Sequence, residues 1–177
     1  MAVRERHEAA FHEFVAVRSS RLFRTALLMV GDYQLAQDLL QESLVKTYAA
    51  WPRLRDVGNA EAYTRRVIVT TSTSWRRRNS FHERPAEALP DGVVADMADL
   101  IAADADLWTH LHALPSRQRA AVVLRYCQDL SEVQTAELMA CTVGSVKRHA
   151  SRGLAKLRAR MGAQLDLPSA DESEVTS

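Results

Sequence analysis

Apolar residues recur along this chain with the spacing of amphipathic helices, and no stretch alternates as a half-buried strand does. Between residues 11 and 30 they fall close to the helical period, and Gly31-Asp32 then offers a helix stop followed by an N-cap. A second helix runs to Trp51, where Pro52 ends it, and a third covers about residues 60–78. The pattern predicts a compact unit of three helices, or of four if the first one breaks.

The same spacing predicts which side chains of this unit face its core. The second helix is expected to bury Ala36, Leu39, Leu40, Leu44, Tyr48 and Trp51. The third helix is expected to bury Tyr63, Val67, Ile68, Thr71 and Trp75.

Helical spacing fades between residues 79 and 102, where prolines, a glycine and scattered acidic residues predict a linker that is flexible or only partly ordered. It returns near residue 104, and Ser116 is then expected to cap a helix whose inner face includes Cys127. The acidic, polar residues from 168 onward are expected to form a disordered tail.

Two short patterns after residue 130 predict a helix-turn-helix. Ser131 and Gln134 have the spacing of a capping box, which starts a short helix ending near Ala140. Thr142 is the next N-cap candidate, and the helix after it combines an apolar stripe with basic outer faces. A short helix, a turn of about three residues and a basic second helix match the arrangement that places the second helix in the DNA major groove.

The residue types on this second helix predict a division of labour. Base edges are read by side chains near the start of such a helix, and an arginine can donate two hydrogen bonds to a guanine. The candidates for base reading are Lys147, Arg148, Ser151 and Arg152. Thr142 and Ser145 lie at the helix start, where hydroxyls and free N–H groups suit a phosphate.

Charge is strongly segregated although the net charge is only +1. Residues 1–80 carry a net charge of +5 and residues 117–160 a net charge of +6, while residues 81–116 carry −6. Two basic blocks around an acidic spacer indicate two modules that bind polyanions, although solvated helix faces can also differ in sign. No apolar run is long enough to cross a membrane and no secretory leader is recognisable, so a cytoplasmic location is expected.

The two cysteines, Cys127 and Cys141, lack the spacing of a metal site and fit a reducing compartment. Buried packing is the expected role of both, with a redox role left open. No metal, cofactor or catalytic residue is expected from the sequence.

The C-terminal motifs closely resemble region 4 of extracytoplasmic-function sigma factors. They are residues 114–119 (LPSRQR), 123–126 (VLRY), 129–132 (DLSE) and 143–147 (VGSVK). The resemblance implies that this half reads the −35 promoter element and contacts the polymerase β flap. One departure is Ala140, where relatives often have a glycine in the turn.

The N-terminal half resembles region 2 of the same family. The residues that carry this resemblance are 22–24 (LFR), 31–32 (GD) and 38–42 (DLLQE), and the wording from residue 61 to 78 is most like an actinobacterial, SigE-type subgroup. It implies that Asp38, Gln41 and Glu42 face the β′ clamp of core RNA polymerase. It also implies a set of contacts to the melting −10 element, namely Arg55, Asn59, Arg65, Arg66, Thr70, Arg76 and Arg77. Thr70 stands where many relatives have an asparagine, which leaves the −10 specificity open.

The resemblance therefore implies an all-α chain of two small domains. Region 2 is expected over residues 5–80, a flexible acidic linker over 81–106, region 4 over 107–162 and a disordered tail over 163–177. The implied partners are core RNA polymerase, promoter DNA and an anti-sigma factor. Two alternatives stay open: a free-standing helix-turn-helix regulator, and a helical enzyme with carboxylate ligands at Asp38 and Glu42.

Overall fold

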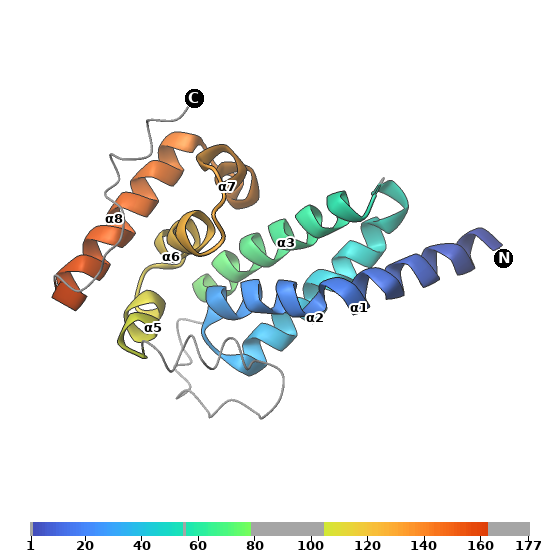
Figure 1. The fold of residues 1–177 in the computed structure, drawn as a ribbon, viewed down its shortest axis with the longest axis horizontal. Coiled ribbons are helices and arrows are strands. Elements are labelled where there is room, and N and C mark those ends of the chain that lie inside the picture. The colour runs from blue at the N-terminus through green and yellow to red at the C-terminus, as the bar shows by residue number, and fades with distance from the viewer. Residues whose placement is uncertain (1, 55, 79–104, 163–177) are drawn as a thin grey trace.

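The computed structural model describes residues 2–54, 56–78 and 105–162, with the side chains of residues 2–4 and 76–78 excepted. The predicted linker and tail therefore lie almost wholly outside the described residues. The described residues form helices and short turns and contain no strand. Figure 1 shows the helices before residue 79 on one side of the molecule and those after residue 104 on the other. The predicted all-α fold is confirmed.

The N-terminal unit consists of α1 (Ala2–Val30), α2 (Tyr33–Ala50) and α3 (Val57–Arg78). Gly31 adopts a φ of 78° at the end of α1 and Asp32 caps α2, with its Oδ1 accepting a hydrogen bond of 2.8 Å from the backbone N–H of Leu35. The stop and restart predicted at Gly31-Asp32 are confirmed. A 3₁₀ turn, Trp51–Arg53, follows α2, and all three helices contact one another.

The buried face of α2 differs from the predicted one. Ala36 and Leu39 are buried as expected, but the next buried positions are Ser43 and Thr47. Their hydroxyls are satisfied inside the core, because each donates to the backbone carbonyl four residues earlier and Thr47 also bonds the hydroxyl of Thr64 on α3 at 2.8 Å. Tyr48, placed in the core by its spacing, is 43% exposed.

The C-terminal unit consists of α5 (Ala105–His112), α6 (Ser116–Val122), α7 (Glu132–Met139) and α8 (Val143–Met161). A π-helical turn, Val123–Cys127, continues α6. Two expectations were wrong here. Ser116 is the first residue of α6 and makes no capping bond, since Pro115 precedes it. Cys127 is exposed, because the wider π turn rotates it away from the core.

The predicted helix-turn-helix is confirmed as α7 and α8. Both bonds of the capping box are present, from the Gln134 N–H to Ser131 Oγ at 3.1 Å and from the Ser131 N–H to Gln134 Oε1 at 2.8 Å. Ala140 ends α7 with φ 51° and ψ 49°, the left-handed conformation that glycine favours. The alanine therefore adopts a left-handed turn conformation in spite of its Cβ. Thr142 caps α8 as expected.

The two units pack against each other through α6 and α7, which contact α3 (Figure 1). The imidazole of His112 lies over Gly31, with its Nε2 3.1 Å from the carbonyl oxygen of Leu28. Gln128 Nε2 donates a 2.9 Å hydrogen bond to Thr25 Oγ1 on α1. The turn of α1 into α2 is thus also a docking point for the C-terminal unit.

Replacing Ala140 with glycine is expected to stabilise the protein by about 0.5–1 kcal/mol. A left-handed conformation costs an L-residue about 1–2 kcal/mol, and the extra flexibility of glycine in the unfolded chain cancels only part of that gain. The control is the same substitution at Ala155, an exposed position inside α8, where it should destabilise by about 1 kcal/mol. Urea unfolding measures both; equal signs for the two variants would contradict the prediction.

Candidate nucleic-acid interface

The outer face of α8 is an exposed basic surface of the C-terminal unit. Arg148, Ser151 and Arg152 are exposed, while Val146, Ala150 and Leu154 hold the opposite face in the core. Gly153 lets α6 approach closely, because a Cβ there would lie only 2.7 Å from Val122 Cγ2. Packing against α6 and α7 fixes the direction in which the arginines point.

The start of α8 is more heavily hydrogen-bonded than the sequence indicates. Thr142 Oγ1 accepts from the Ser145 N–H at 3.2 Å, and the two hydroxyls lie 2.9 Å apart. Part of the hydrogen-bonding capacity of each hydroxyl is therefore already used in the cap. Lys147 Nζ lies 3.5 Å from Glu132 Oε2, so part of its charge is neutralised by the start of α7. Arg148 and Arg152 are left as the stronger candidates for a base edge.

Arg117, at the start of α6, joins this surface although sequence reasoning did not single it out. Its charge acts on His149 of α8 together with the charges of Arg148 and Arg152. Burial and these three arginines lower the pKa of His149. Only the basic composition of residues 117–160 pointed toward Arg117, because its place beside α8 depends on tertiary packing.

Asn59 lies in the first turn of α3, because the helix begins at Val57 and not near residue 60 as the sequence predicted. Asp56 draws the helix start back to this point, since its carboxylate accepts from both the backbone N–H of Asn59, at 2.7 Å, and its side-chain amide, at 3.0 Å. Asn59 is exposed but its amide is partly committed to Asp56.

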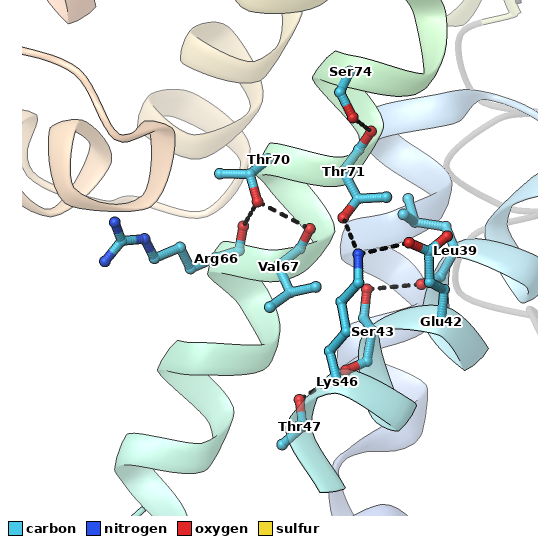
Figure 2. A network of polar contacts seen from close by, with 10 residues as sticks. All are labelled: Leu39, Glu42, Ser43, Lys46, Thr47, Arg66, Val67, Thr70, Thr71 and Ser74. Carbon is cyan, nitrogen blue, oxygen red and sulfur yellow. Dashed lines mark hydrogen bonds and ion pairs between the residues drawn. The ribbon is translucent and has the colours of Figure 1, made fainter. Parts of the chain in front are cut away.

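Arg66 and Thr70 share one side of α3, and Figure 2 shows them on the side away from Lys46. Arg66 is exposed and Thr70 is half-buried. The Thr70 hydroxyl donates to the carbonyl oxygens of Arg66 and Val67, at 2.8 and 3.3 Å, so it can only accept from a base. Arg65 points to another side and pairs with Glu61 at 3.1 Å. Arg55 and the side chains of Arg76 and Arg77 lie outside the described residues.

The three residues Asp38, Gln41 and Glu42, here called the polar stripe, lie on α2. Asp38 and Gln41 line a groove of about 820 Å³ between α1 and α2, whose apolar lining includes Phe11, Leu44 and Tyr48. Glu42 lies 2.6 Å from Lys46 Nζ, which also reaches Thr71 on α3 at 3.5 Å (Figure 2). The sequence placed Leu44 and Tyr48 in the core, so it missed the apolar part of this groove.

The described residues contain no cluster of three or more histidine, cysteine or acidic side chains able to hold a metal ion. None of their helices is long and apolar enough to span a membrane. Cys141 is half-buried and packs against the core next to the turn, whereas Cys127 is exposed.

Comparisons with known proteins agree with the two-unit division. Sigma-70 region 2 matches residues 15–82, and Sigma-70 region 4 matches residues 105–157. The RNA polymerase sigma-E factor of Streptomyces avermitilis is 41% identical over 148 residues, which cover 84% of this chain and 83% of that protein. The sigma-E factor of Streptomyces coelicolor is 38% identical over 154 residues, 87% of each chain. The chain belongs to the sigma-70 family, as an RNA polymerase sigma factor of the extracytoplasmic-function type.

A solved structure supports the same fold. The sigma factor RpoE from Bartonella quintana, crystallised with the anti-sigma factor NepR, aligns with a TM-score of 0.67 at 20% identity and covers 88% of this chain and 99% of that one. The SigE-type resemblance seen in the sequence is confirmed by the Streptomyces relatives. As a member of this family, the chain is an alternative sigma factor that directs transcription initiation.

The lowered pKa of His149 predicts a loss of stability in mild acid. The unfolded chain takes up a proton near the ordinary pKa of 6.5, before the folded protein does, so the free energy of unfolding falls as the pH drops below that value. Replacing His149 with glutamine should therefore reduce the loss of stability between about pH 7.5 and pH 5.5. Urea unfolding at the two pH values measures it, with His12→Gln on α1 as the substitution control. Curves that run parallel for wild type and His149→Gln would refute the assignment.

Proposed function

We propose that α8 reads the −35 element in duplex form while α3 acts on the −10 element as it opens. The exposed arginines on the first half of α8, presented by a capped helix-turn-helix, are the observation that carries this proposal. Arg148 and Arg152 contact base edges, and Thr142, Ser145, Lys147, Ser151 and Arg117 support the register through phosphates and nearby bases. Arg66 and Thr70 contact the separated strand, with Asn59 at the start of the same helix.

The polar stripe on α2 binds the clamp of core polymerase in this proposal, and region 4 binds the flap. A groove with an apolar floor and acidic or amide groups at its edge suits a partner helix that buries apolar side chains and carries basic ones. The chain supplies binding and specificity in the cytoplasm and no catalysis of its own. An anti-sigma factor is a further proposed partner, since the similar Bartonella sigma factor is seen with one.

The packing of the two units bears on this division of labour. Two promoter elements about two helical turns apart are separated by roughly 70 Å of duplex. In the structure, however, α6 and α7 contact α3 directly. The two units therefore separate when both elements are bound, and the His112 and Gln128 contacts with α1 are broken in the process.

We expect initiation by this protein at specific promoters to require the polar stripe. With purified core polymerase, wild type should give discrete run-off transcripts from a genomic promoter library. Asp38→Ala should lower transcript yield several-fold and weaken the association with core polymerase, because it removes an exposed carboxylate from the groove edge. Glu13→Ala, which removes the same charge from an exposed position of α1 outside the groove, is the control. A protein that binds a palindromic operator and ignores core polymerase would be a free-standing regulator instead.

Two arginines on α8 should differ in the kind of binding they supply. Arg152→Ala should cost about 1–3 kcal/mol at the preferred −35 sequence and much less at unrelated DNA, as expected for a base contact. Arg160→Ala, at an exposed position at the end of the same helix, should weaken both sequences alike. Competition binding of holoenzyme to matched and scrambled −35 duplexes separates the two. Loss of discrimination in Arg160→Ala alone would reverse the assignment.

A further inference from the structure

Three arginines from two helices surround one carboxylate at the seam between α1 and α3. Arg65 Nη2 lies 3.1 Å from Glu61 Oε1, one turn along α3. From α1, Arg18 Nε lies 3.4 Å from Glu61 Oε2 and Arg21 Nη1 lies 3.6 Å from Glu61 Oε1. These four residues, called the seam cluster below, carry three positive charges and one negative charge.

The seam cluster is incompletely neutralised. The side chains of Glu61 and Arg65 are only 14% and 13% exposed, so water screens their charges poorly. Burial lowers the pKa of Arg65, and the nearby charge of Arg21 lowers it further, whereas Glu61 raises it. The Nε groups of both Arg18 and Arg65 are buried and donate no hydrogen bond to any described residue. A second anion would relieve this repulsion by accepting hydrogen bonds from the exposed parts of the Arg18 and Arg21 guanidinium groups.

The open side of the cluster is formed by α1. The side chain of Arg21 is 65% exposed and that of Arg18 is 35% exposed, so an incoming ligand can reach both guanidinium groups. Arg66, on the proposed strand-binding side of α3, directly follows Arg65 and lies about 100° further around the helix. A nucleic-acid strand whose phosphates contact Arg66 therefore also reaches the seam cluster within one turn of α3.

We propose that Arg18, Arg21 and Arg65 form a phosphodiester-binding site at the α1–α3 seam, which holds the backbone of the separated promoter strand next to α3. Guanidinium groups match the non-bridging oxygens of a phosphate, and a phosphodiester brings one negative charge to a cluster of net charge +2. Glu61 orients the three arginines and limits the attraction, so the contact is electrostatic and independent of base identity. This site rests on the proposed function of α3.

The test uses full-length protein in holoenzyme, with a forked promoter DNA whose −10 region is single-stranded on the non-template strand. Binding is measured across a range of salt concentrations. Arg21→Ala should weaken binding several-fold and reduce the slope of log K against log salt by about 0.7, the value for one contact to single-stranded DNA. The control, Arg6→Ala, removes the same charge from an exposed position of α1 about 22 Å away along the helix and should change neither.

A second variant distinguishes a binding site from a purely structural ion cluster. Glu61→Gln raises the net charge of the cluster to +3, so it should tighten binding to the fork and leave the slope at least as steep. A structural cluster would instead lose stability and bind more weakly. The proposal is overturned if Arg21→Ala keeps the salt slope of Arg6→Ala, or if Glu61→Gln weakens binding to the fork, whether its melting temperature falls or matches wild type.

The same preparations separate this proposal from the proposed function itself. If wild-type holoenzyme gives specific run-off transcripts but Arg21→Ala binds the fork like Arg6→Ala, only the seam site is wrong. If wild-type holoenzyme neither initiates nor binds the fork specifically, the proposed role of α3 has failed.

Discussion

The direction of α8 depends on the capping of a helix too short to be stable by itself. An isolated helix of eight residues is not stable in water, so α7 exists because both of its ends are satisfied and one face is buried. Ser131 and Gln134 close its start, and Ala140 takes a left-handed conformation at its end. Thr142 then begins α8 two residues later. These local hydrogen bonds and the turn at Ala140 therefore determine where the arginines on α8 lie.

The difference between local and distant contacts explains which features the sequence predicts well. Helix starts closed by their own side chains, at Asp32, Ser131 and Thr142, follow from neighbouring residues alone. Where no such bond exists, prediction fails: α6 begins after Pro115 without a side-chain cap. The prediction of buried faces also fails where the packing is not purely apolar. Two threonines, one of α2 and one of α3, bond each other in the core, and larger side chains of α2 lie at the groove instead.

For the candidate interface, the sequence indicates which arginines lie on an outer face but not which are already paired. Arg152 and Arg65 both come from basic stretches, yet Arg152 is exposed and Arg65 is held in the seam by Glu61. The difference arises from the approach of α1 to α3, which brings Arg18 and Arg21 to the same carboxylate. Periodicity within one helix carries no information about that approach.

The ion pairs and hydrogen bonds of the chain affect how its two basic units can lie in contact. A basic surface that binds polyanions strongly is repelled by other basic surfaces, and the two basic units of this chain nevertheless touch. Two hydrogen bonds join them, in which His112 and Gln128 meet backbone and hydroxyl oxygens of α1. Acidic partners pair with Lys147 and Arg65 within the two units. Such contacts are individually weak. A partner that binds both units must compete with these hydrogen bonds and with the packing of α6 and α7 on α3, because the buried apolar cluster includes residues of both units.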